Sequence, residues 1–237
     1  MEGLWSTEEF VKRLRAVGEA KYHDRHPFQL RMNEGRLSPE QFRRWVLNRF
    51  YYQKNIPIKD AIVLSRLPTR EDRREWLQRI IDHDGRRQDE GGIEAWLCLG
   101  EAAGLSRDRM LDDAGILPGV RFAVDGYLNF CRLQSWPEAV ASSLTELFAP
   151  DLVAHRIQVI ERHYSWVRPE GLRYFHQRLN QAPRDVDHAL GLVIRSAKTR
   201  RDQELAIAAL SFKCDVLWSL LDAIDGHCHD HAADRVV

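Results

Sequence analysis

Apolar residues recur along this chain at the three- and four-residue spacing of helices, and the alternation typical of strands is almost absent. The clearest helix is expected from Ser38 to about Arg66, because Ser38, the proline after it and Gln41 form a capping box. This pattern predicts a compact all-α bundle in one helical domain, residues 1–226. The other helices are expected from Ser6 to about Val17, briefly after Pro27, and over Thr69–Gly85, Gly91–Ala103, Pro118–Leu133, Pro137–Phe148, Pro150–Tyr164, Pro169–Gln181, Pro183–Lys198 and Arg201–Asp225.

One stripe of the helix after Ser38 is polar where a core-facing stripe would be apolar. A side-chain stripe of this kind is either a wall that binds an anion or a face exposed to solvent. Pro57 lies beside it and lacks a backbone N–H, so we expect the helix to kink or break there and to open space for a ligand. At about 100° per residue, the stripe contains Arg49, Gln53, Ile56 and Asp60, with Tyr52 and Lys59 at its sides.

Lys213 stands on the apolar stripe of the last helix. Leu210, Leu217 and Leu220 lie three residues before it and four and seven residues after it. A buried lysine must find a counter-charge, lose its proton or bind an anion. A structural ion pair, or a stem that carries the ammonium group to water, is the alternative. We interpret Lys213 as a cation that binds a ligand.

His83 lies between two aspartates, just before the glycine expected to end its helix. This position is typical either of a histidine stabilised by the helix dipole or of a proton-transfer group. Tyr174 and Arg178 are four residues apart and share a helix face. They are either an exposed pair or two members of one site.

The composition is that of an ordinary globular protein, with 44% hydrophobic and 30% charged residues. Thirty-five basic residues balance 35 acidic ones, which argues against a general nucleic-acid-binding protein. No apolar run of about 18 residues is present, so no membrane span is expected. The start of the chain lacks the features of a signal peptide, and four cysteines are scattered without CxxC spacing. We therefore expect a cytoplasmic protein with reduced thiols.

The end of the chain is rich in possible metal ligands. His227, Cys228, His229 and His231 follow Gly226, but nothing apolar surrounds them. We expect residues 227–237 to be a disordered tail whose affinity for metal is adventitious.

Several long motifs in order, from about Tyr22 to about Asp222, resemble the pyrroloquinoline-quinone synthase family. The resemblance implies a heme-oxygenase-like fold, usually found as a homodimer. It also implies an oxidase without metal or organic cofactor, which closes and oxidises a bicyclic tricarboxylate precursor with O2 and releases pyrroloquinoline quinone (PQQ) and H2O2. The motifs are Tyr51–Asp60, Asp82–Gly85, Gly91–Trp96, Leu117–Asp125 and Ser142–Pro150.

The family's active-site positions carry over to residues of this chain. Where di-iron relatives of the fold carry His-x-x-x-Asp-x-x-His, this chain has Tyr174, Arg178 and Gln181, so we expect no iron centre. The resemblance implies His83, Tyr174, Arg178 and Lys213 as catalytic residues. It implies Tyr22, His23, Arg49, Gln53, Lys59, Arg79, Tyr127, Glu146 and Arg156 as substrate-binding residues, of which Glu146 could by its pattern also be solvated.

One position departs from the family pattern. Three residues before Arg156 the family has a histidine, whereas this chain has Val153. His155 lies about 200° away around the helix, so it cannot substitute without a local bulge. Two other functions stay open: a protein that binds PQQ or its precursor without turnover, and a thiaminase-like hydrolase, for which Cys214 beside Lys213 is the nucleophile to test.

Overall fold

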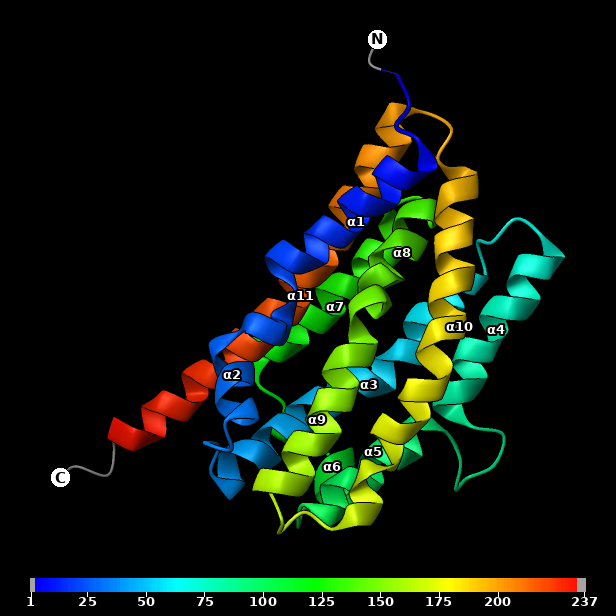
Figure 1. The fold of residues 1–237 in the computed structure, drawn as a ribbon. Coiled ribbons are helices and arrows are strands. Elements are labelled where there is room, and N and C mark those ends of the chain that lie inside the picture. Colours follow the sequence, from blue (N-terminus) through cyan, green and yellow to red (C-terminus); the bar gives the residue numbers. More distant parts are fainter. Residues whose placement is uncertain (1–2, 234–237) are drawn as a thin grey trace.

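The computed structural model describes the backbone of residues 3–233, and the side chains of Pro150 and residues 227–233 lie outside the described part. Helices and connecting turns make up the described chain, which contains no strand, so the predicted all-α class is confirmed (Figure 1). The α-helices are α1 (Thr7–Lys21), α2 (Pro27–Asn33), α3 (Pro39–Leu64), α4 (Arg70–Asp84), α5 (Gly91–Ala102), α6 (Arg107–Leu111), α7 (Pro118–Leu133), α8 (Trp136–Ser142), α9 (Ala149–His163), α10 (Arg173–Ser196) and α11 (Arg200–Ala233). Short 3-10 helices are η1 (His23–Arg25), η2 (Asp113–Gly115), η3 (Ser143–Phe148) and η4 (Pro169–Leu172).

Three long helices organise the bundle. Helix α3 packs against α4, α5 and α7, whereas α11 packs against α1, α7 and α8. Helix α10 packs against α8, α9 and η3. Figure 1 shows α1 running along α11, and α10 beside α4. This arrangement brings one face each of α3, α10 and α11 toward the middle of the bundle.

Helix α3 begins at the predicted capping box. The Ser38 Oγ accepts a hydrogen bond from the Gln41 backbone N–H at 3.2 Å, and the Gln41 side chain accepts one from the Ser38 N–H at 2.9 Å. Of the kink or break expected at Pro57, the break is not formed, because the helix continues through this buried proline to Leu64. Packing on both sides of α3 therefore outweighs the cost of an interior proline, about 3 kcal/mol.

Other predicted boundaries also differ from the structure. Pro183 lies inside the continuous helix α10, so the predicted separation of two helices there is wrong. The helix expected over Pro137–Phe148 ends at Ser142 and continues as η3, because the Ser142 hydroxyl donates to the Ala139 carbonyl oxygen at 2.7 Å and competes with the regular helix bonds.

The last helix is longer than predicted. The backbone of α11 is helical to Ala233, beyond the predicted end at Asp225 and beyond the predicted domain boundary at Gly226. The disorder expected for residues 227–237 stays a prediction. The side chains of residues 227–237, including His227, and the backbone of residues 234–237 lie outside the described residues.

An aromatic core joins α3, α5 and α10. The Trp45 and Trp96 rings meet edge to face at 5.5 Å, and Trp96 meets Tyr174 in the same way at 4.9 Å. The Trp96 indole N–H donates to the Val46 carbonyl oxygen at 2.9 Å, which satisfies its buried polar group. The core therefore holds Tyr174 against a rigid aromatic support.

The turn between α4 and α5 closes tightly behind His83. Gly85 and Gly91 both have positive φ, 77° and 88°. A Cβ atom at Gly91 would stand 2.6 Å from the His83 carbonyl oxygen and 2.5 Å from the Gly85 nitrogen. Only glycine meets both demands, so this turn fixes the end of α4 that carries His83.

We predict that Gly91→Ala lowers the free energy of unfolding by about 1–3 kcal/mol, because a non-glycine residue is strained at this φ and also clashes with backbone atoms. Gly126→Ala is the matched control. Its Cβ meets nothing within 4 Å inside α7, so helix propensity predicts stabilisation by about 0.5–1 kcal/mol. Urea denaturation followed by circular dichroism measures both. Equal midpoints for the two variants would contradict the role assigned to the turn.

Candidate active site

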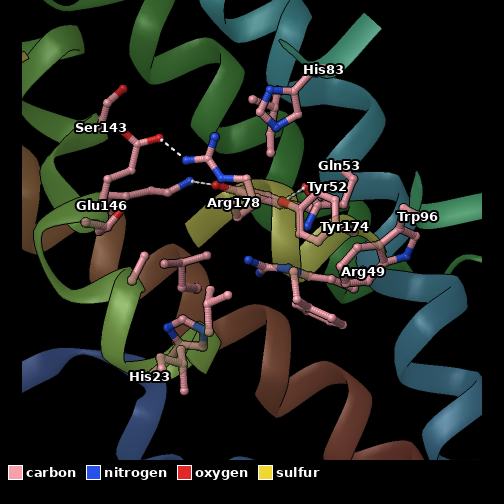
Figure 2. A pocket seen from close by; sticks show the side chains of 18 of the residues that line it. His23, Arg49, Tyr52, Gln53, His83, Trp96, Ser143, Glu146, Tyr174 and Arg178 are labelled. Atoms are coloured by element: carbon pink, nitrogen blue, oxygen red, sulfur yellow. Dashed lines mark hydrogen bonds and ion pairs between the residues drawn. The ribbon is translucent and has the colours of Figure 1, made fainter. Parts of the chain in front are cut away.

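The inward faces of α3, α10 and α11 enclose a cavity, which α4, α7, α9, η1 and η3 complete. Every site residue expected from the sequence lines it except Arg79 (Figure 2). Residues scattered from one end of the chain to the other therefore meet in one place. The predicted residues on its wall are Tyr22, His23, Arg49, Gln53, Lys59, His83, Tyr127, Glu146, Arg156, Tyr174, Arg178 and Lys213.

The polar stripe of α3 forms one wall of this cavity. Arg49, Gln53 and Ile56 face the cavity as the helical spacing predicted. Lys59 also reaches the cavity, where its Nζ donates to Asp60 at 2.6 Å and to the Ser143 hydroxyl at 3.1 Å. The interpretation as a solvated face is therefore wrong, because the stripe lines the cavity, and anion binding by this wall stays a prediction.

Two arginines are paired with carboxylates. Glu146 accepts from Arg178 at 3.1 Å and from Arg79 at 2.8 Å. Arg178 also binds Asp185 at 3.2 Å. Arg79 is buried, does not line the cavity, and holds Glu146 in place. Glu146 is thus an ion-pair partner with only 20% of its side chain exposed, rather than a solvated residue.

Three other cations on the wall have no such partner. No carboxylate in the described part of the chain forms an ion pair with Arg49, Arg156 or Lys213. The Arg156 guanidinium lies 5.2 Å from the Trp45 ring centroid and donates to Gln29, but its Nε is buried without a partner. Burial and the neighbouring Arg49 lower the pKa of Arg156 to about 10. These side chains leave the cavity with an excess of positive charge, which is suited to an anionic ligand.

Lys213 is 1% exposed, as its apolar stripe predicted. Its Nζ donates to the Tyr52 hydroxyl at 2.7 Å and lies 3.4 Å from the centroid of the Tyr127 ring. Burial, together with Lys59 and Arg49, lowers the pKa of Lys213 well below its ordinary value. Within the described residues Lys213 forms no structural ion pair, the alternative that the sequence left open, because it contacts the neutral rings of Tyr52 and Tyr127.

His83 and Tyr174 have the environments of a base and an acid. The His83 Nδ1 lies 3.1 Å from the Arg79 carbonyl oxygen, so this nitrogen carries the proton, and the buried Nε2 has no partner. Burial and the nearby Arg178 lower the pKa of His83 to about 4, which keeps the ring neutral at pH 7 and able to accept a proton. The Tyr174 hydroxyl donates to the Gln53 side chain at 2.9 Å, and burial raises its pKa.

The position that departs from the family pattern lies on the cavity wall. Val153 lines the cavity on α9, which is helical without interruption from Ala149 to His163. His155 is exposed and lines a different hollow, together with Arg15 and Asp151. The predicted helix register is confirmed, and the bulge that His155 would need is not formed.

Several wall residues were not predicted. Tyr52 was seen only as a neighbour of the α3 stripe, and Trp96 only as part of a motif. Leu217 lies four residues after Lys213, which was a usable signal, whereas Phe175 directly follows Tyr174 and adjacent residues do not share a helix face. Ser143 and Thr145 come from η3, a 3-10 helix in which the α-helical spacing of about 3.6 residues does not predict the direction of a side chain. The three described cysteines do not line the cavity, and burial raises the pKa of Cys214 to about 11, which is unsuited to a thiol nucleophile.

The described residues contain neither a membrane-spanning helix nor a cluster of metal ligands. No helix among them is long and apolar enough to cross a membrane. No three His, Cys, Asp or Glu side chains within residues 3–226 come together in a way that could hold a metal ion.

Known proteins resemble the chain over most of its length. It is 55% identical over 216 residues to a pyrroloquinoline-quinone synthase of Pseudomonas aeruginosa, a match covering 91% of this chain and 86% of that protein. It is 52% identical over 221 residues to a pyrroloquinoline-quinone synthase of Cronobacter sakazakii, covering 93% and 88%.

The fold comparison agrees with the sequence comparison. A crystal structure from Shewanella denitrificans, described as a domain of unknown function with a heme oxygenase-like fold, superposes with a TM-score of 0.77. It is 12% identical, and the match covers 95% of this chain and 94% of that one, so it supports the fold alone. The model of the TENA/THI-4/PQQC family matches residues 11–223. With that match and the two synthases above, the chain belongs to the TENA/THI-4/PQQC family.

Proposed function

We propose that this protein catalyses the last step of PQQ biosynthesis, the ring closure and oxidation of a bicyclic tricarboxylate precursor. The observation that carries the proposal is the cavity with three cations that lack carboxylate partners, in a chain 55% identical to a pyrroloquinoline-quinone synthase. A ligand with three carboxylates supplies the negative charge that the wall lacks. Arginine suits such a ligand because its planar donors bind a carboxylate at two points.

The wall orients the precursor as well as binding it. Arg49 and Lys59 stand on α3, whereas Arg156 and Lys213 approach from α9 and α11. Carboxylates held from several sides leave the precursor few orientations, which favours an intramolecular ring closure. Arg178 is also on the wall, but Glu146 and Asp185 already hold it in one position.

The neutral residues of the wall move protons. His83 Nε2 is unprotonated and unpartnered, so it can take a proton from the substrate. Removal of protons makes the ring an electron-rich anion, which the cations stabilise. Each oxidation then transfers two electrons and two protons from the ring to O2 and yields one H2O2. The substrate supplies the electrons, and the proposal therefore needs neither a metal nor an organic redox cofactor.

We also propose an oligomeric state, a cellular compartment and a class of partners for this protein. A homodimer in the cytoplasm, with no nucleic-acid partner and no membrane partner, is what the family resemblance and the balanced charge of the chain support.

Aerobic incubation of the purified protein with the bicyclic precursor tests the reaction. We expect the absorbance of PQQ to rise together with H2O2, and we expect neither product without O2. Chelation should leave the rate unchanged, because the proposed step uses no metal. Binding of the precursor without turnover in air would show a sequestering protein instead, and about two irons per chain that are needed for turnover would overturn the cofactor-free mechanism.

We predict that Lys213→Met weakens PQQ binding by about tenfold to hundredfold, because a hydrogen bond to a charged group contributes about 1.5–3 kcal/mol. The same change should keep or raise the thermal midpoint, because it removes a buried ammonium group that no carboxylate compensates. Fluorescence titration and calorimetry measure the two effects.

Lys54→Met is the matched control for this variant. Lys54 is on α3, pairs with Asp113 and does not line the cavity. We expect unchanged PQQ affinity for it. A Lys213→Met protein that binds PQQ normally but unfolds at a lower temperature would make Lys213 a structural residue.

Val153→His and His155→Ala test the departure from the family pattern. Val153 lines the cavity, so an imidazole there should speed the oxidative steps in single turnover, by up to about 10²–10⁴-fold if it acts as a general acid or base. His155 is exposed on the other side of α9, so its removal should be nearly neutral. A dead His155→Ala variant beside an unchanged Val153→His variant would reverse these assignments.

A further inference from the structure

Tyr52 lies beside the polar stripe of α3, and its contacts with the cations of the cavity were not predicted from the sequence. Its hydroxyl accepts the hydrogen bond of the Lys213 ammonium at 2.7 Å. The Arg49 guanidinium lies over its ring at 4.2 Å, and the Lys213 Nζ lies 4.3 Å from the same ring centroid. One phenol thus contacts two of the three cations that lack a carboxylate partner.

The contacts with Tyr52 matter because little else holds Lys213. Apart from Tyr52, the Lys213 Nζ contacts the face of Tyr127, 3.4 Å from the ring centroid. An aromatic face attracts a cation, but it supplies no directed acceptor. Among the described residues, the Tyr52 oxygen is the hydrogen-bond acceptor for the Lys213 ammonium. It therefore fixes the direction in which the Lys213 Nζ points.

The surroundings of Lys213 otherwise disfavour its charge. Desolvation and two neighbouring cations act against the ammonium form, and no described carboxylate pairs with it. Glu146 lines the same cavity, but it is bound to Arg79 and Arg178. The other titratable or charged groups that act on Lys213 from the elements around it are Arg49, Lys59, Tyr127, Cys131, His23 and Cys214.

We propose that Tyr52 is a positioning residue that holds Lys213 protonated and Arg49 flat against the cavity wall, ready for an anionic ligand. The anionic ligand rests on the function proposed above, whereas the contact of Tyr52 with Lys213 involves only residues of this chain. The two ideas can therefore fail separately.

The neighbouring tyrosine supplies a control of the same chemistry. Tyr51 also lies between two cations, with Lys54 at 5.2 Å and Arg121 at 5.3 Å from its ring. Its hydroxyl donates to Asp125 at 3.0 Å, and it does not line the cavity. Tyr51→Phe and Tyr52→Phe remove the same atom from adjacent residues, one outside the site and one within it.

The first measurement needs no ligand. The chain has six lysines, so selective carbon-13 labelling gives few signals, and Lys213→Met identifies that of Lys213. We expect Tyr52→Phe to lower the pKa of Lys213 by about one unit or more, because the ammonium loses a hydrogen bond. Tyr51→Phe should leave this titration unchanged. An unshifted Lys213 signal in Tyr52→Phe would overturn the proposal.

The second measurement is PQQ affinity against pH. Tyr52→Phe should bind more weakly than the wild type near neutral pH, and the difference should shrink as the pH falls and Lys213 regains its proton. A loss of the same size at every pH would mean that the phenol contacts the ligand directly, and it would overturn the positioning role. If the wild type binds no PQQ, the proposed function fails, but the lysine titration still decides the role of Tyr52.

Discussion

Uncompensated positive charge inside the bundle is the constraint on which the rest of the structure depends. Arg49, Arg156 and Lys213 converge on one cavity without a carboxylate partner in the described chain. Burying a charge in this way is costly unless other groups stabilise it. Here the stabilising groups are aromatic: Tyr52 lies against Arg49 and Lys213, and Trp45 lies against Arg156.

The cationic side chains around the cavity are of two kinds. Arg178 is held by Glu146 and Asp185, and Arg79 also pairs with Glu146, so this side is a closed network of ion pairs. The opposite side offers cations whose partners are neutral. A ligand carboxylate that meets the second kind need not displace a protein carboxylate, so more of its binding energy is retained.

Helical periodicity predicted the part of this arrangement that depends on one helix at a time. It placed Lys213 on an apolar stripe and Gln53 on a wall, and both positions are confirmed. It failed where contacts between distant segments decide the outcome. Pro57 does not break α3, because packing against neighbouring helices outweighs the local cost of a proline.

The same limit explains the residues that were misplaced or missed. Arg79 was expected to bind substrate at the cavity wall. Its partner Glu146 is 67 residues away, and the sequence does not show that this ion pair holds Arg79 outside the cavity lining. The position of Tyr52 in the site is defined by its hydrogen bond with Lys213, which lies 161 residues further along the chain. Spacing along one helix gives the direction of a side chain but not the atom that it meets.

The neutral partners of the cations also bear on how the catalytic cycle ends. In the proposed reaction the carboxylates of the precursor are not consumed, so Arg156 and Lys213 would contact the carboxylates of the product as well as those of the substrate. Interactions that bind substrate, transition state and product equally do not lower the activation barrier. Departure of PQQ, rather than oxidation, is then expected to limit turnover.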